Sequence, residues 1–407
     1  MQTYLAQGRL LPFLFAALLV IPAPDVLSQT TNPILELKTG DRIIILGNAL
    51  AENEQFYNYL EFGLSRHWPE QSITFRNLGW SGDNVFGDAR SYYTSPPSPY
   101  ELLMSQISEA NPTHAIVAYG GVEAHDGVAG LEKFAEGLEK LLAKFEELGS
   151  KVILLSPIPQ FGGATPEYIE ARNRELQRYA DKIAQSAQKH GGIYIDLMQP
   201  FLSIDFVASD DGLHLNEAGY YFLSEEVEKS LGLSTSSKNL TINPDGTINS
   251  SQRVFVDSFD PKNGRLSFRT EENLLPKPLP KVQESSEFAA PVLTIKGLKK
   301  GFYELTANGE HVASASSKAW AEGVPIHQGG NWKQSEYLRR LLNRKDEVFF
   351  FKYRPLNRTY IIGFREYEQG RHRKDLDDFD IVLTWLQGQI TEAKKPTQVQ
   401  FKLSPIP

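Results

Sequence analysis

The sequence predicts an α/β fold in which helices cover both faces of a parallel sheet, followed by a β-rich C-terminal extension. From Gly40 to Leu231, short apolar runs alternate with longer amphipathic stretches, which is the pattern of parallel strands joined by helices. After Leu231 the segments become shorter and are separated by turn signals such as Asn308-Gly309, which is typical of hairpins.

The predicted strands of the first part are short apolar runs, and the predicted helices repeat apolar residues every three or four positions. Ligands bind beyond the carboxyl ends of the strands in such a sheet, so the loops that follow the strands form the expected functional rim. The predicted strands are Arg42–Leu46, Ile73–Asn77, His114–Tyr119, Lys151–Ser156 and Ile193–Asp196, and the predicted helices are Glu52–His67, Pro99–Ala110, Ala129–Leu148, Pro166–His190 and Asn216–Ser230.

The second part is predicted to contain several short strands and two helices. Ser234–Asn249 is rich in Ser, Thr and Asn and is predicted to be a linker, whereas Leu274–Val282 carries several prolines and is predicted to be extended. The predicted strands are Val254–Val256, Arg265–Phe268, Val292–Ile295, Phe302–Ala307, His311–Ala313, Val348–Tyr353 and Tyr360–Ile362, and the predicted helices are Trp332–Leu342 and Phe379–Gln389.

Composition limits the kinds of partner and chemistry. The chain has 407 residues, 41% of them hydrophobic, which suits one large domain plus a second unit. Its net charge of -8 argues against a nucleic-acid partner. The lack of cysteine excludes disulfides, thiolate metal sites and cysteine nucleophiles. His125 and Asp126 could assist a metal, but no third ligand stands at a recognisable spacing, so neither a metal site nor a cofactor is predicted.

The N-terminus is predicted to be a signal peptide, which implies a secreted or periplasmic protein. Arg9 precedes the apolar run Leu10–Ile21, and the residues before Ser28 fit a cleavage site. This run is shorter than the roughly 20 apolar residues of a membrane span, and no later segment is predicted to span a membrane. A buried or unstructured N-terminus is the alternative. The predicted domain boundaries are 1–28 for the signal peptide, 38–232 for the α/β domain and 233–407 for an extension that packs on it.

Two glycine-rich segments leave the predicted sheet at the functional rim. Asn77–Asn84 (NLGWSGDN) contains Gly79 and Gly82, which allow the backbone to turn its amides toward a ligand. Ala118–Gly127 (AYGGVEAHDG) follows the next strand in the same way. A plain turn is the alternative for Asn77–Asn84 taken alone.

A third segment combines an acid and a histidine. In DGLHLNEAGY, Asp211 stands three residues before His214, just ahead of a predicted helix. An aspartate at that offset can orient the imidazole, as a general base requires. Because Asp-x-x-His also arises by chance on protein surfaces, the pair gains meaning only beside the two glycine-rich segments.

In their order and sheet positions, the strand exits resemble those of the SGNH or GDSL-type hydrolases, a family of esterases and lipases, over roughly residues 40–231. The resemblance implies a flavodoxin-like three-layer sandwich and an ancestral activity on esters, such as acylated carbohydrates. It also implies that Gly82 donates a backbone N–H to the oxyanion, that His214 is the base and that Asp211 orients it.

Two positions depart from the family pattern, and both carry its chemistry. The first block, normally Gly-Asp-Ser, reads Gly47-Asn48-Ala49, so Ala49 stands where the family has its nucleophilic serine. The third block, normally Gly-x-Asn, ends in Val122 in place of the asparagine that donates to the oxyanion. Loss of a triad nucleophile lowers the rate by several orders of magnitude, and loss of one oxyanion donor by roughly two to three.

The C-terminal segment Lys352–Arg371 resembles one that follows SGNH domains in secreted proteins of planctomycetes and their relatives, a branch whose first block is also degenerate. The matching residues are Arg354, Asn357, Tyr360, Arg365 and Glu368. Such a polar cluster suits hydroxylated or anionic ligands, although it could instead anchor the extension to the sheet. The residues predicted to bind substrate are Asn48, Asp83, Arg354, Asn357 and Tyr360.

Three functions therefore remain open. The first is a module that binds a small molecule or carbohydrate and has little or no esterase activity. The second is a hydrolase in which His214 and Asp211 activate a water molecule in the space left by the serine, or in which Ser81 or Asp83 acts instead. The third is a structural or interaction protein, which predicts a closed rim and a buried His214.

Overall fold

The computed structural model describes residues 35–90, 97–233, 239–250, 253–281, 288–354 and 376–406. The predicted signal peptide and the predicted strand Tyr360–Ile362 lie outside these residues. Within these ranges, no helix combines the length and the apolar character that crossing a membrane requires.

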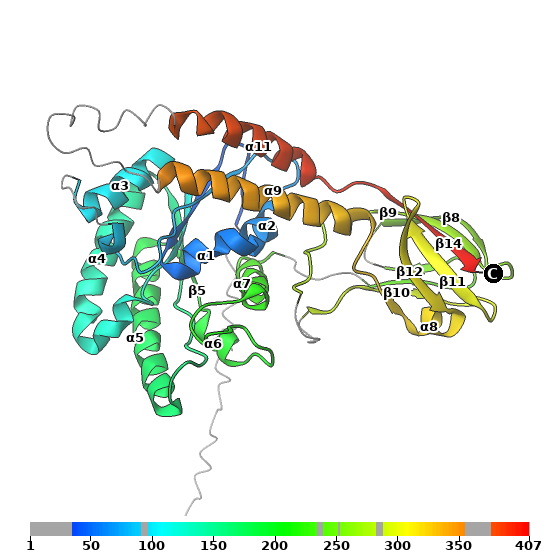
Figure 1. The fold of residues 1–407 in the computed structure, drawn as a ribbon, viewed down its shortest axis with the longest axis horizontal. Helices are drawn as coiled ribbons and strands as arrows, with labels where there is room; N and C mark the ends of the chain where they lie inside the picture. Colours follow the sequence, from blue (N-terminus) through cyan, green and yellow to red (C-terminus); the bar gives the residue numbers. More distant parts are fainter. Residues whose placement is uncertain are drawn as a thin grey trace, which may run out of the picture. The chain divides into compact units, whose positions relative to one another are not determined.

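The predicted parallel sheet is confirmed. Its five strands have the order β2-β1-β3-β4-β5, and all neighbouring pairs are parallel (Figure 1). Gly47 lies opposite Ala118, so the turn after β1 and the loop after β3 leave the sheet at the same edge. Each predicted strand is found to within one residue at either end. The strands are β1 (Arg42–Gly47), β2 (Thr74–Asn77), β3 (His114–Ala118), β4 (Lys151–Leu155) and β5 (Ile193–Ile195).

Helices cover both faces of the sheet because successive strand residues point to opposite sides. Ile43 and Ile45 of β1 pack with α1, α2, α6 and α7, whereas Ile44 and Leu46 pack with α3, α4 and α5. The short helix α6 is absent from the prediction. The helices are α1 (Ala49–Tyr57), α2 (Tyr59–Arg66), α3 (Pro99–Ala110), α4 (Gly127–Glu147), α5 (Pro166–His190), α6 (Met198–Leu202) and α7 (Glu217–Ser230).

The single predicted helix Glu52–His67 is wrong, because α1 and α2 are separate helices. Asn58 lies between them with a φ of 52°, in the left-handed region that asparagine tolerates better than most residues. Its N–H caps α1 by donating to the Glu54 carbonyl, and its side chain donates to Gln55. Asn58 therefore ends one helix and starts the next at a new angle.

Two further sheets form in the C-terminal part, with the orders β13-β10-β6-β7 and β12-β11-β14-β9-β8. The predicted linker Ser234–Asn249 is partly wrong because it contains β6 and β7, and β14 is missing from the prediction. β6 pairs with β10 and β14 lies between β9 and β11, so partners distant in sequence create both strands. The elements are β6 (Leu240–Ile242), β7 (Ile248–Asn249), β8 (Arg253–Asp260), β9 (Arg265–Glu271), β10 (Val292–Ile295), β11 (Phe302–Ala307), β12 (Glu310–Ser316), α8 (Ser317–Glu322), β13 (Val324–Pro325) and β14 (Val399–Ile406).

The long helices α9 (Gly330–Tyr353) and α11 (Phe379–Ala393) lie side by side and join the core on the α3–α5 face of the parallel sheet (Figure 1). The predicted strand Val348–Tyr353 is wrong, because these residues form the last turns of α9. Val348 and Phe349 are buried while Phe351 is exposed, which is a helical and not a strand pattern. The aromatic run favours a strand locally, and packing on the core overrides it.

Candidate functional site

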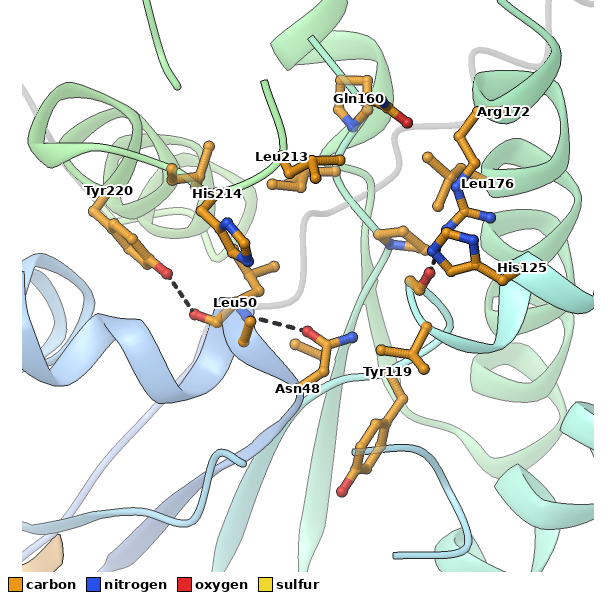
Figure 2. A pocket seen from close by; sticks show the side chains of 18 residues that line it. Asn48, Leu50, Tyr119, His125, Gln160, Arg172, Leu176, Leu213, His214 and Tyr220 are labelled. Atoms are coloured by element: carbon orange, nitrogen blue, oxygen red, sulfur yellow. Dashed lines mark hydrogen bonds between the residues drawn. The ribbon is translucent and has the colours of Figure 1, made fainter. Parts of the chain in front are cut away.

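A cavity of about 210 Å³ opens at the carboxyl edge of the parallel sheet. Its walls come from the residues that follow β1, β3 and β4, from α5, and from the segment before α7. Figure 2 shows His214 on one side of this cavity and His125 with Arg172 on the other. The polar side chains in its lining are those of Asn48, Tyr119, His125, Gln160, Arg172, His214 and Tyr220.

Asn48 and Ala49 form the turn from β1 into α1 and line the cavity. The Oδ1 atom of Asn48 accepts a hydrogen bond from the Leu50 N–H at 3.1 Å and so caps α1 (Figure 2). Because Oδ1 makes this bond, the other amide atom of Asn48, Nδ2, faces Gly121. A Cβ atom added to Gly121 would lie 3.2 Å from this Nδ2. Ala49 begins the helix, so the predicted nucleophile position carries only a methyl group.

No other described residue of the cavity lining replaces the missing serine. The only hydroxyl groups there belong to Tyr119 and Tyr220. Tyr119 donates to Asp83 at 2.8 Å, and Tyr220 donates to the Leu50 carbonyl at 2.9 Å. Burial raises the pKa of both phenols well above their ordinary value, so both stay protonated and neither is a nucleophile at neutral pH.

The structure brings Asp211 and His214 together as the sequence spacing suggests. The distance between His214 Nδ1 and Asp211 Oδ2 is 2.6 Å. Asp211 Oδ1 also accepts the backbone N–H groups of Leu213 and His214, at 2.8 and 2.7 Å. The hydrogen bond with the His214 ring contributes most to keeping the pKa of Asp211 well below its usual range, and the backbone hydrogen bonds add to this effect. A permanently ionised Asp211 therefore orients the ring and leaves Nε2 to accept a proton.

The loop that carries this pair is held by the loop after β4. The carbonyl of Gly212 accepts hydrogen bonds from the N–H groups of Phe161 and Gly162, at 2.9 and 3.3 Å. Gly212 has a φ of +81°, and a Cβ there would lie 2.2 Å from the Gly162 carbonyl carbon. Only glycine fits this close approach, which sets the position of His214. The His214 side chain is 52% exposed, so the buried histidine expected of a purely structural protein is not found.

The predicted oxyanion loop lies next to α1. Gly82 has a φ of +78°, which favours glycine, but Gly82 is not among the residues that line the cavity. Ser81 donates its N–H to Glu52 of α1 at 2.5 Å and is also outside the lining. Asp83 is fully buried, with its carboxylate 2.8 Å from Arg90 Nε. These contacts hold the loop, and Asp83 is not among the residues that line the cavity.

Glu123 connects the two glycine-rich loops through hydrogen bonds to both of them. It follows Val122, which lines the cavity and offers no donor in its side chain. The Glu123 carboxylate accepts the N–H of Val85 at 3.0 Å and the N–H of Gly120 at 2.8 Å. Burial raises the pKa of Glu123 to about 7. One buried carboxyl group therefore ties the loop after β2 to the loop after β3.

Arg172 and His125 are among the lining residues that the sequence analysis misses as ligand-binding residues. Arg172 lies in α5 and is 9% exposed, and it donates from Nη2 to the Gly121 carbonyl at 2.5 Å. In the sequence it resembles its exposed neighbours Arg174 and Arg178, so no local signal separates it from them. Its role becomes visible only when α5 packs beside the loop after β3.

Arg354, in the C-terminal part of the chain, contacts the predicted oxyanion loop and is not among the residues that line the cavity. Its guanidinium carbon lies 4.0 Å from the centre of the Trp80 ring, and Nη1 lies 3.0 Å from Glu52. The preceding residue, Tyr353, donates to the Gly79 carbonyl at 2.5 Å. These contacts favour the anchoring alternative for Arg354, whereas Asn357 and Tyr360 lie outside the described residues. Within the described ranges, no group of three or more acidic or histidine side chains could hold a metal.

The comparisons with known proteins agree with this architecture. The family model of the GDSL-like lipase/acylhydrolase family matches residues 39–222. A gut microbial diltiazem-metabolizing enzyme aligns with 92% of this chain and 100% of its own, with a TM-score of 0.70 and 16% identity. A catalytic mutant of an acetylxylan esterase from Geobacillus stearothermophilus aligns with 49% of this chain and 98% of its own, with a TM-score of 0.40 and 16% identity. No curated protein matches the chain.

At 16% identity, the first of these structures shows a common fold over nearly the whole chain and nothing of its chemistry. The family assignment depends on the family model, whose match begins just before β1 and ends within α7. It thus covers the turn with Ala49, both glycine-rich loops and the Asp211–His214 pair. Residues 39–222 thus form a GDSL-like lipase/acylhydrolase domain, in agreement with the resemblance of their sequence to the SGNH/GDSL hydrolases.

Proposed function

We propose that this protein binds a small hydroxylated or acylated ligand in the cavity beside Ala49 and has lost the serine-dependent acyl transfer of its family. One observation carries the proposal: the cavity keeps an oriented Asp211–His214 pair, whereas a methyl group occupies the nucleophile position. Val122 also lacks the amide donor that the family uses, so transition-state stabilisation is weakened as well.

Restoring the missing groups tests this proposal. The wild type should hydrolyse p-nitrophenyl acetate no faster than buffer, Ala49→Ser should gain turnover, and Ala49→Ser with Val122→Asn should be faster still. His214→Ala in the double variant should remove the gain. Hydrolysis by the wild type that requires His214 would overturn the loss of activity. A folded double variant without turnover would instead show that the preserved residues no longer form a catalytic site, which supports a role in binding alone.

A second candidate is a hydrolase that needs no protein nucleophile. The 2.6 Å contact with Asp211 orients the His214 ring and leaves its Nε2 free of that partner. In this reaction Nε2 takes a proton from water as the water oxygen attacks the ester carbonyl carbon. The C–O bond to the alcohol then breaks, and the alcohol leaves with the proton from His214, while the acid is released. Wild-type activity that His214→Ala abolishes and that serine-directed phosphonates do not inhibit would establish this candidate.

We also propose that the protein is exported and that its N-terminal segment is removed. The support is the single cation Arg9 before an apolar run that ends at Pro22. Expression of the full chain in a bacterial host, followed by N-terminal sequencing of the periplasmic and cytosolic fractions, tests it. Cleavage near Ser28 with export is the expected result, and an intact cytosolic chain would contradict it.

A further inference from the structure

The guanidinium group of Arg172 is buried in the cavity wall, and one of its nitrogen atoms makes no hydrogen bond with the described residues. The residue is 9% exposed, and Nη2 is occupied by the Gly121 carbonyl at 2.5 Å. Nη1 is buried and has no hydrogen-bond partner among the described residues. Because an unpartnered buried charge is unfavourable, such a group points to a partner that arrives with the ligand.

The groups around Arg172 favour a negatively charged partner. None of the described residues that line the cavity is acidic, and the lining includes the guanidinium group of Arg172. Glu175, one turn further along α5, lies 3.4 Å from Arg178 and also attracts the Arg172 guanidinium, but it is not among the residues that line the cavity. Burial and the adjacent Arg172 both lower the pKa of His125, so its neutral ring can donate or accept one further hydrogen bond. The guanidinium group of Arg172 therefore gives the described lining a fixed positive charge, in a protein whose net charge is -8.

We propose that Arg172 determines specificity by binding an anionic group of the ligand, namely a carboxylate or sulfate on a sugar-sized molecule. The bond from Nη2 to Gly121 fixes the guanidinium plane, and Nη1 donates to the anion. Figure 2 places His214 across the cavity from Arg172, so the rest of the ligand lies toward His214. This inference rests on the proposed binding function and names its ligand class.

Binding of matched neutral and charged sugars to the full chain tests the inference. By titration calorimetry, D-glucuronate or D-glucose 6-sulfate should bind the wild type at least about tenfold more tightly than D-glucose. The better of the two charged sugars identifies the anion. Arg172→Met should abolish the preference, and Arg172→Lys should keep only part of it because lysine lacks the planar pair of donors. The control Arg174→Met removes an exposed arginine of the same helix, which pairs with Glu170, and should change nothing.

Four results would overturn the inference, and they separate it from the binding function. Equal affinity of the wild type for neutral and charged sugars would refute the role of Arg172 and leave cavity binding intact. A charge preference that persists in Arg172→Met would place the anion elsewhere. Failure of every sugar to bind would refute both proposals. If Arg172→Met does not fold, a preference in Arg172→Lys equal to that of the wild type refutes the role of the guanidinium group.

Discussion

Single residues decide what chemistry remains in the cavity, and Asn48 is the clearest case. The resemblance assigns aspartate to this position and an asparagine donor to position 122, whereas the chain has an amide at the first and Val122 at the second. Because Oδ1 of Asn48 caps α1, its Nδ2 faces Gly121, next to the place of the lost donor. One amide donor is therefore still close to the site, although it comes from a different strand.

Coupled variants would show whether Asn48 takes over this role. In the Ala49→Ser background, Asn48→Asp should lower kcat for p-nitrophenyl acetate by roughly 100-fold, because it removes the remaining amide donor. In Ala49→Ser with Val122→Asn, the same change should have little effect, since the amide introduced at position 122 then supplies the donor. Equal losses in both backgrounds would mean that Asn48 acts only as a helix cap.

The stability contributed by Glu123 should fall as pH rises. Burial raises its pKa in the folded protein to about 7 from an ordinary value of 4.5. The folded state then binds the proton more tightly than the unfolded chain, so this contribution is full below pH 4.5 and is lost as pH rises through about 7. The free energy of unfolding of the wild type, relative to Glu123→Gln, should drop by roughly 3 kcal/mol across this range.

Urea denaturation at several pH values measures this difference. The lost acceptor in Glu123→Gln adds a constant offset, so the slope with pH is the informative quantity. Glu170→Gln, which removes an exposed carboxylate of α5, should run parallel to the wild type. If the difference in free energy of unfolding between the wild type and Glu123→Gln stays constant between about pH 4.5 and 8, the pKa of Glu123 is not shifted.

At the scale of elements, the end of α9 fixes the loop that carries Gly82. Tyr353 donates to the Gly79 carbonyl at 2.5 Å, and Arg354 covers Trp80 while pairing with Glu52. Glu52 in turn accepts the N–H of Ser81 at 2.5 Å. A helix from the C-terminal part thus holds the predicted oxyanion loop against α1.

Removal of the Tyr353 hydroxyl should loosen this loop. A neutral hydrogen bond contributes about 1 kcal/mol, so Tyr353→Phe should speed amide hydrogen exchange at residues 79–83 by roughly fivefold. Exchange in the parallel strands should not change. Tyr337→Phe, on an exposed part of the same helix, is the matched control. Unchanged exchange in Tyr353→Phe would show that Trp80 and Arg354 suffice to hold the loop.

At the scale of the whole molecule, the core of the parallel sheet extends into the C-terminal part. Leu338 and Leu342 of α9 and Leu386 of α11 belong to the same core as Leu46 of β1. The fully buried Lys345 of α9 forms an ion pair with Glu61 of α2, itself nearly fully buried. Residues more than 280 positions apart therefore share one buried contact.

Breaking this ion pair should destabilise the whole fold. Lys345→Met removes the ammonium group that pairs with the buried Glu61 and Asp346 and should lower the free energy of unfolding by about 3 to 5 kcal/mol. Adding Glu61→Gln should recover part of the loss, which a double-mutant cycle would detect. Lys333→Met removes an exposed lysine of α9 that pairs with Glu310 and should cost less than about 1 kcal/mol. If Lys345→Met costs no more than this control, the pair does not link α9 to the sheet.

The sequence by itself determined the parallel sheet, most of its helices and the missing nucleophile. These features depend on local patterns: apolar runs, capping residues, and short motifs such as Gly47-Asn48-Ala49 and Asp211-x-x-His214. Such signals act within a few residues, so β1 to β5 were predicted almost to the residue. The same local nature explains the errors at Asn58 and at Val348–Tyr353, where a backbone twist and a distant core decide the conformation.

Only the tertiary structure decided which polar groups meet in the cavity and which are used up in holding its loops. Arg172 faces the ligand space because α5 packs beside Gly121, whereas Asp83 is withdrawn by Arg90. Arg354 pairs with Glu52, although its sequence context favours a ligand. A side chain can bind a ligand only when its partners within the protein leave a donor or acceptor free, and that balance depends on contacts between residues far apart in the chain.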